Sequence, residues 1–230
     1  TPEIIAAAET IAGLEFSPQE REQLARSLAV LPRNFAKLRE VPLANSVPPA
    51  LRFSPVLPGM SFAMEQRPAV FSEGPLPDVP ADIEKLAFWS ALDLGRAIRA
   101  KKVSSLALTM MYLSRLKRFD PVLKCVVNLT EERALAKAQQ ADEEIAAGRI
   151  RGPLHGVPWG AKDLLAAGGY PTTWGATPFR EQRIEEDATV VTRLDDAGAV
   201  LIAKLSLGEL AQGDQWFGGQ TKNPWNPQAG

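Results

Sequence analysis

Apolar residues recur at helical spacing in the first forty residues. A serine and a glutamate three residues apart, Ser17 and Glu20, form a capping box around a proline, and three leucines follow on one face, namely Leu24, Leu28 and Leu31. We therefore predict helices over residues 4–40. The pattern ends at residue 41, because residues 41–80 hold nine prolines. Proline lacks the backbone N–H, so a continuous helix is excluded there, and the apolar residues between the prolines predict an extended arm packed along a globular body.

A second periodic region begins near Asp82. We predict helices over residues 88–100 and 103–119, the second capped by Ser104 or Ser105 and stopped at Asp120–Pro121. The run LKCVVNLT predicts a buried strand, and residues 131–148 predict a polar amphipathic helix closed by Gly148.

The clearest unit is EEDATVVTRLDDAGAVLIAKL, residues 185–205. We predict a helix capped by Asp187, ended by Gly198 and followed by the apolar strand AVLIA, with one apolar helix face made of Val190, Val191, Leu194 and Ala197. A helix, a tight turn and a buried strand in succession indicate an α/β fold, with a central sheet covered by helices on both faces. The tail from residue 213 predicts loop.

Composition excludes several classes of protein. The chain has 230 residues and a net charge of −1, so a basic nucleic-acid-binding face is not expected. No apolar run reaches the roughly 20 residues that a membrane-spanning helix needs. The single cysteine, Cys125, excludes an intrachain disulfide, and its apolar surroundings predict that it acts as a small buried hydrophobic residue. The absence of a disulfide favours a reduced cytoplasm as the compartment. The single histidine, His155, excludes multi-histidine metal sites and is expected to be structural.

Motif searches remove other chemistries. Neither GxxxxGK[ST] nor GxGxxG nor GxSxG occurs in the sequence. The SRLK at 114–117 matches the SxxK pattern of β-lactamases, but the SDN and KTG elements are absent, so we interpret it as a chance match on a solvated helix face.

Lys162 lies in the apolar, turn-rich stretch GPLHGVPWGAKDLLAAGGYP, in which Lys162 and Asp163 carry the only formal charges. The preceding VPW fits a short strand. Desolvation lowers the pKa of a lysine because the charged form is disfavoured, and a lysine used as a general base needs this. The alternative is a lysine that extends to solvent or pairs with a buried carboxylate. Asp163 is a poor direct partner, because neighbours in a strand point to opposite faces.

Three blocks of the sequence together resemble the amidase signature family: residues 152–179, residues 185–213 and KNPWNP. The resemblance covers about residues 150–230, and the helices from 85 to 147 fit the family's usual lead-in. It implies a mixed sheet flanked by helices, and an amidase that uses a Ser–cis-Ser–Lys triad without metal or cofactor. By position, Lys162 corresponds to the triad lysine, which activates the bridging serine.

The resemblance also implies what this chain does not carry. Both triad serines are expected beyond residue 230, so the chain resembles the family's N-terminal half, and the C-terminal half is an expected partner. Such a partial sheet is expected to leave apolar surface exposed. The block beginning at Lys204 departs from the common pattern, and Ser206 has no triad role by position. We expect substrate contacts at Gln212, Gly213 and Asp214, and a family block to support the lysine strand through Thr172, Thr173 and Gly175.

The first 81 residues lie outside the resemblance and form the predicted N-terminal extension, with the amidase-like part over residues 82–230. Residues 14–43 faintly resemble the small wrapping subunit of tRNA-dependent amidotransferases; the alternative is a helical extension with an oligomer contact, which leaves a homodimer open. The leading hypothesis is a soluble cytoplasmic amidase acting on a small-molecule amide, with no nucleic acid or membrane as partner. A glutaminase subunit of a tRNA-dependent amidotransferase and a non-catalytic amidase-like scaffold are the alternatives.

Overall fold

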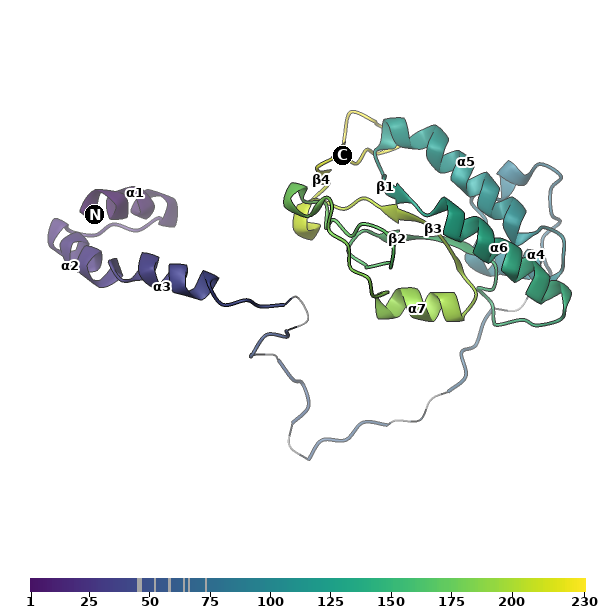
Figure 1. Ribbon diagram of the computed structural model, residues 1–230, viewed down its shortest axis with the longest axis horizontal. Helices are drawn as coiled ribbons and strands as arrows, with labels where there is room; N and C mark the ends of the chain where they lie inside the picture. Colours follow the sequence, from purple (N-terminus) through teal and green to yellow (C-terminus); the bar gives the residue numbers. More distant parts are fainter. Residues whose placement is uncertain (45–46, 52, 58, 64, 66, 73) are drawn as a thin grey trace. The chain divides into compact units, whose positions relative to one another are not determined.

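The computed structural model describes residues 1–44, 47–51, 53–57, 59–63, 65, 67–72 and 74–230. Two compact units divide the chain, Thr1–Ala69 and Val70–Gly230, and each is described by itself (Figure 1). The predicted division at residues 81 and 82, between an extension and an amidase-like part, stays a prediction.

The first unit contains three helices, α1 (Pro2–Ala12), α2 (Pro18–Leu28) and α3 (Leu31–Arg39), which confirms the predicted helical segment. The capping box is present: the Glu20 N–H donates to Ser17 Oγ at 3.3 Å, and the Ser17 N–H donates to the Glu20 carboxylate at 2.7 Å. The Arg21 guanidinium donates to both oxygens of the Glu9 carboxylate, at 2.9 and 2.7 Å, and so joins α1 to α2.

The described residues between 41 and 80 contain no helix and no strand, as the prolines predict. The packing of this arm along a globular body stays a prediction. Several apolar side chains in the arm are exposed, among them Leu51, Phe53 and Val70.

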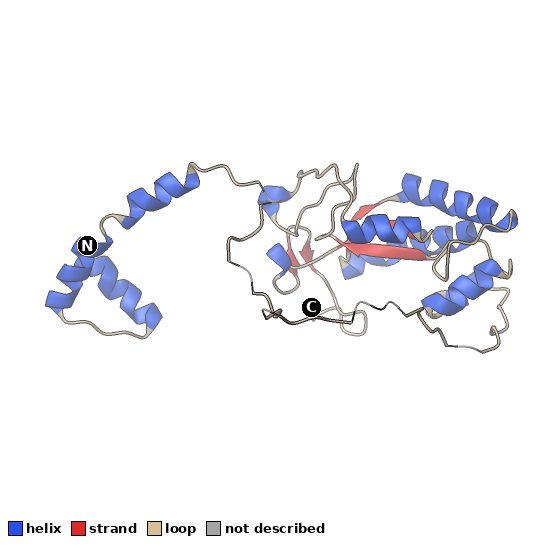
Figure 2. Cartoon of the chain, turned by 90° about the horizontal axis from the view of Figure 1, so that it is seen from below, coloured by secondary structure: helices blue, strands red, loops and turns tan. Residues whose placement is uncertain are grey.

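The second unit is a mixed α/β structure, which confirms the predicted fold class (Figures 1 and 2). Its helices are α4 (Ala91–Arg99), α5 (Ser105–Leu123), α6 (Glu131–Ala146) and α7 (Thr189–Asp196), with 3-10 turns η1 (Ile83–Leu86), η2 (Thr177–Phe179) and η3 (Glu209–Ala211). Its strands are β1 (Val126–Leu129), β2 (Pro158–Lys162), β3 (Val200–Leu205), β4 (Gln215–Trp216) and β5 (Gly219–Gln220).

The main sheet has the strand order β1-β3-β2, with β1 antiparallel and β2 parallel to the central β3. Helices α5 and α6 pack on one face, where Leu113, Ala134 and Ala138 meet Val200 and Ile202. Helix α7 and the loop after β2 pack on the other face, where Val191 and Ala167 meet Leu201 and Ala161 (Figure 1). The strand β3 is buried on both faces, which explains its apolar run.

Three local predictions were wrong. Helix α5 does not stop at Asp120–Pro121 but ends at Leu123, because a proline near the end of a helix removes a single hydrogen bond and Lys124, with φ of 50°, makes the actual turn. The predicted strand at 123–130 is shorter, from Val126 to Leu129, and half-buried. The tail is not all loop, because β4 and β5 pair as a small antiparallel ribbon.

The predicted cap of α7 was also wrong. Ala188 occupies the N-cap position, and the Asp187 carboxylate instead accepts from the Gly168 N–H at 2.6 Å and from the Arg133 guanidinium at 3.1 Å. Asp187 therefore ties the start of α7 to α6 and to the loop after β2. Of the four residues predicted to form the apolar face, Val191 is buried, whereas Val190 is exposed.

Candidate active site

Lys162 is the last residue of β2, and it lies at the carboxyl end of the parallel strand pair. The sheet register pairs Lys162 with Leu205, the last residue of β3. In open α/β sheets, ligands bind outside the carboxyl ends of the strands. The backbone therefore places Lys162 at the edge of the sheet where a binding site is expected.

The Lys162 side chain is exposed. The prediction that it is desolvated was therefore wrong for residues 1–230. The preceding residue, Ala161, packs with Ala167 into the core beneath α7. Among the residues that the structure describes, no hydrogen bond or ion pair engages the Lys162 ammonium group.

Asp163 points to the opposite face of the sheet, as the strand alternation predicts, and meets Lys204 there. Both side chains are completely buried. Lys204 Nζ donates to Asp163 Oδ1 at 2.6 Å, to the Pro171 carbonyl at 3.1 Å and to Thr172 Oγ1 at 3.1 Å. This pair is the only ion pair in the described chain whose two side chains are both fully removed from solvent.

Thr173 holds the other oxygen of the same carboxylate. Its backbone N–H donates to Asp163 Oδ2 at 2.9 Å, and its hydroxyl also donates to this oxygen. The Thr173 hydroxyl in turn accepts from the Gly175 N–H at 3.2 Å. Thr172 thus contacts Lys204, Thr173 contacts Asp163, and Gly175 supports Thr173.

The two lysines at this sheet edge differ in what they can do chemically. An ammonium group has three N–H donors, and three acceptors surround Lys204 Nζ, so every donor of this group has a partner. A buried nitrogen surrounded in that way has no position left for a substrate or a serine hydroxyl. Lys162 lacks such partners in the described chain, and its exposed nitrogen is accessible to such a group.

The loop that carries the expected substrate contacts follows η3. Gln212 and Gly213 are exposed, and the Asp214 carboxylate accepts from Gln220 Nε2 at 2.9 Å. Two backbone hydrogen bonds join the flanks of this loop to the segment 172–175, called the threonine loop below. The Leu210 N–H donates to the Trp174 carbonyl at 2.8 Å, and the Phe217 N–H donates to the Gly175 carbonyl at 3.1 Å. The structure therefore connects this loop to the segment that holds Asp163, and the substrate role of the three residues stays a prediction.

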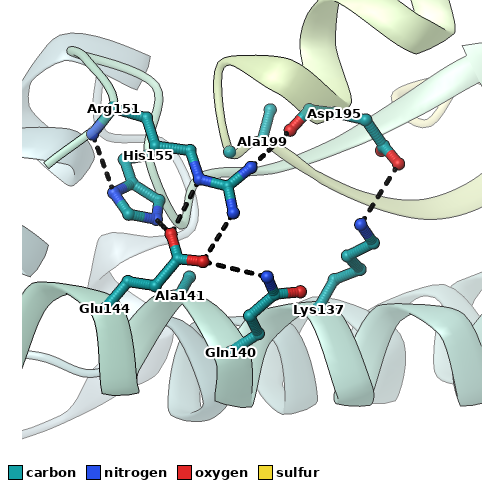
Figure 3. A pocket seen from close by; sticks show the side chains of 9 residues that line it. Lys137, Gln140, Ala141, Glu144, Arg151, His155, Asp195 and Ala199 are labelled. Carbon is teal, nitrogen blue, oxygen red and sulfur yellow. Dashed lines mark hydrogen bonds and ion pairs between the residues drawn. The ribbon is translucent and has the colours of Figure 1, made fainter. Parts of the chain in front are cut away.

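His155 lies in a separate polar cluster at the start of β2, the end of the strand away from Lys162 (Figure 3). Its Nδ1 accepts from the Arg151 N–H at 3.2 Å, and Nε2 lies 3.3 Å from the Glu144 carboxylate. The Arg151 guanidinium holds the pKa of Glu144 down at about 2, and burial lowers the pKa of His155. The adjoining cavity of about 10 Å³ is close to the size of a single water position, so we assign the cluster a structural role.

Other candidate chemistries find no support in the described residues. They include no group of three or more His, Cys, Asp or Glu side chains placed to hold a metal ion. Cys125 is half-buried, and burial beside Asp120 raises the pKa of its thiol, so it is a poor nucleophile. None of the helices in the described part of the chain has the length and hydropathy that crossing a bilayer requires.

Lys204 and its pairing with Asp163 were missed by sequence reasoning. The signal was present, because Lys204 directly follows the apolar run AVLIA and precedes another leucine, and a lysine cannot be buried there without a countercharge. Asp163 also lies in an apolar run, so its carboxylate likewise needs a countercharge if it is buried. Two opposite charges in two predicted buried segments point to each other once the strands are taken as neighbours.

The mixed α/β fold of the second unit is shared by solved amidases. The native peptide amidase from Stenotrophomonas maltophilia superposes with a TM-score of 0.57 and is 36% identical, over 62% of this chain and 31% of that one.

The chain belongs to the amidase family, as its sequence blocks predict: the family model Amidase matches residues 107–229. The putative amidase AmiD of Mycobacterium tuberculosis (strain ATCC 25618 / H37Rv) is 44% identical over 148 residues, which are 64% of this chain and 30% of that protein. One subunit of the glutamyl-tRNA(Gln) amidotransferase of Halorhodospira halophila is 39% identical over 140 residues, 60% of this chain and 29% of that protein. The chain therefore spans about 30% of the length of these curated relatives.

Proposed function

We propose that the protein hydrolyses a carboxamide C–N bond through an acyl-enzyme, with Lys162 as the general base. The observation that carries this proposal is the contrast between the two lysines at one sheet edge. Lys204 is buried with three acceptors, whereas Lys162 ends the parallel strand with its amine unengaged in the described chain. Membership in the amidase family supports the reaction class.

In the proposed mechanism, neutral Lys162 accepts a proton from a bridging serine, which accepts the proton of the nucleophilic serine. That serine attacks the amide carbonyl, and the tetrahedral intermediate collapses as the amine or ammonia leaves with a proton returned by the same relay. Water then repeats the sequence and releases the acid. Both serines would come from sequence that follows Gly230, as the family resemblance implies.

A base of this kind must be neutral when the reaction begins, and an exposed lysine is charged at neutral pH. We infer that the segment that supplies the serines also covers Lys162 and removes water from its amine. The loop at 212–214 would border the same space and contact the substrate, because its flanks are bonded to the threonine loop beside β2.

A second function deserves a test because of one specific likeness. The 39% identity to a subunit of a glutamyl-tRNA(Gln) amidotransferase is compatible with a glutaminase that passes ammonia to a partner. Both functions would use the same lysine, so a Lys162 variant does not discriminate between them. The two functions differ in whether the released ammonia goes to water or to an acceptor on a partner.

The experiment uses the protein with the sequence that follows Gly230. Ammonia and amine release is measured on a panel of aliphatic, aromatic and peptide amides, and on glutamine with and without tRNA and ATP. The proposal expects turnover of at least one simple amide without tRNA or ATP, and loss of about 1,000-fold or more in Lys162→Ala. The matched control Lys102→Ala removes another exposed lysine, after α4, and should keep full activity. Release only from glutamine, and only in the presence of tRNA and partner subunits, would favour the amidotransferase instead.

A further inference from the structure

The buried pair formed by Asp163 and Lys204 lies directly behind Lys162 in the sheet. Ala161 pairs with Lys204 and Lys162 pairs with Leu205, so Lys204 and Lys162 point to opposite faces of the same two strands. Asp163 follows Lys162 in the chain and shares the face of Lys204, as their contact at 2.6 Å shows. The exposed Lys162 side chain and the buried Asp163–Lys204 pair are therefore separated by a single peptide group of the backbone.

We propose that Asp163 and Lys204 are positioning residues for Lys162, which fix its backbone and keep the charge behind it balanced. The inference rests on the proposed function, because it assigns the pair a task for the base.

The positioning part follows from the number of bonds at one residue. The Asp163 N–H donates to the Leu205 carbonyl at 2.8 Å, one carboxylate oxygen binds Lys204, and the other binds the backbone and hydroxyl of Thr173. The Lys162 carbonyl accepts from the Leu165 N–H at 3.0 Å. With both the carbonyl and the N–H of the peptide group between residues 162 and 163 held, the backbone from which the Lys162 side chain leaves the sheet is fixed on this side.

The electrostatic part follows from the balance of the pair. A buried carboxylate without Lys204 would attract a proton to the nearby amine of Lys162, and a buried ammonium without Asp163 would repel one. Together they present little net charge to the neighbouring amine. In this proposal the task of Lys204 is to compensate the Asp163 carboxylate, so that no net charge lies behind the Lys162 amine.

Other groups at this edge do not depend on the pair. On the face of Lys162 the adjacent strand residues are apolar, Leu205 in β3 and Val126 in β1. Titratable residues on the described segments that are bonded to this end of the sheet include Asp120, Lys124, Cys125, Tyr170, Arg180, Glu209, Asp214 and Lys222. They are unchanged in every variant below, so a difference between variants reports the pair.

The test measures the protonation of Lys162 directly, in the protein with the sequence that follows Gly230. Lys162 is labelled with trace acetic anhydride across a pH series, and its acetylation is quantified by peptide mass spectrometry, which needs no catalysis. Relative to the unchanged protein, the midpoint pH of labelling should rise in Lys204→Met and fall in Asp163→Asn, each by roughly half a unit or more. The double variant Asp163→Asn with Lys204→Met should return close to the original midpoint.

Shifts in opposite directions that cancel in the double variant support the inference. Midpoints that shift in the same direction in both single variants, or that do not shift, overturn it. If the pair were purely structural, removing either member would disturb the site in the same way, whichever charge is removed. Amide hydrolysis is assayed in parallel. Opposed shifts in a protein that hydrolyses no amide would reject the proposed function while keeping the charge balance, and hydrolysis without opposed shifts would do the reverse.

A milder pair of variants covers the case in which the charge variants fail to fold. Thr173→Val keeps the shape and removes the hydroxyl donor to Asp163, whereas Thr173→Ser keeps the donor. We expect about a tenfold or greater loss in kcat at unchanged KM for the valine variant, and recovery by serine. Equal activity of the two variants would contradict the positioning role.

Discussion

Two lysines in neighbouring strands have opposite environments because of what surrounds their nitrogen atoms. Lys204 lies in the core and meets a carboxylate, a hydroxyl and a carbonyl, which together compensate the loss of water. Lys162 extends from the end of β2 into solvent. Residue type alone does not separate a structural lysine from a candidate base, but the acceptors around each nitrogen do.

This contrast predicts different effects on stability. Lys204→Met leaves Asp163 as a buried, uncompensated charge and should lower the free energy of unfolding by about 3–5 kcal/mol. Lys162→Met, the matched control, should change it by no more than about 0.5 kcal/mol, because an exposed side chain without partners in the described chain is replaced. Urea unfolding measures both, and equal losses would contradict the assignment of the buried and the exposed lysine.

His155 predicts a dependence of stability on pH. Burial lowers the pKa of His155 below its ordinary 6.5, so the unfolded chain binds a proton more readily than the folded one. Stability from this residue is fully present above pH 6.5 and is lost as the pH falls below that value, with a slope of at most about 1.4 kcal/mol per pH unit. His155→Gln should remove this component. Parallel unfolding curves against pH for the two proteins, between pH 7 and 5, would show that the histidine does not titrate in this way.

At the scale of elements, the loop from Asp163 to Gly175 makes the site, and Gly175 gives it its shape. Gly175 has φ of +70°, and a Cβ there would lie 2.4 Å from the Leu207 carbonyl oxygen. The loop can approach the end of β3 this closely only without a side chain at that position. The close approach keeps Thr173 within reach of Asp163.

Substituting two glycines of similar backbone conformation separates the cost of backbone strain from the cost of a steric clash of the added Cβ. Gly169→Ala, with φ of +82° and nothing within 4 Å of the added Cβ, should cost about 1 kcal/mol of unfolding free energy from the backbone alone. Gly175→Ala should cost about 2–4 kcal/mol, because the same strain is joined by the clash with a backbone carbonyl. Thermal unfolding of both variants provides the comparison, and a smaller loss at Gly175 would mean that the loop lies farther from β3.

The elements with strong periodicity could be predicted from sequence, and those fixed by distant partners could not. The apolar run of β3, the capping box of α2 and the end of α6 near Gly148 depend on local residues and were confirmed. Asp187 was assigned to the helix it precedes, but Arg133 and Gly168, far away in the sequence, bind its carboxylate. The same limit hid the Asp163–Lys204 pair, whose members are 41 residues apart.

At the scale of the whole molecule, the two units differ in how much apolar surface they bury. In residues 1–44 the only buried side chain is that of Glu9, whereas α4, α5, α6 and β3 all bury apolar residues. Local opening is least costly where few apolar contacts must be broken. The helices of the first unit therefore have little packing of their own to stabilise them.

Hydrogen exchange should reveal this difference. Backbone amides in α1, α2 and α3 are expected to exchange at least about tenfold faster than those in α5 and β3 at the same pH. Mass spectrometry of peptides from a deuterium-labelling series compares them within one sample. Equal protection of α1–α3 and α5 would contradict the expectation and would show that apolar contacts outside these helices stabilise them.

The proposed task of Lys162 is to activate a serine for attack on an amide carbonyl. The most direct measurement is covalent labelling of the protein with the sequence that follows Gly230, using a fluorophosphonate that reacts with activated serines, followed by intact mass. We expect one label on the unchanged protein and on Lys102→Ala, and no label on Lys162→Ala under the same conditions. Labelling of Lys162→Ala at the rate of the unchanged protein would contradict the account, because the serine would then be activated without this lysine.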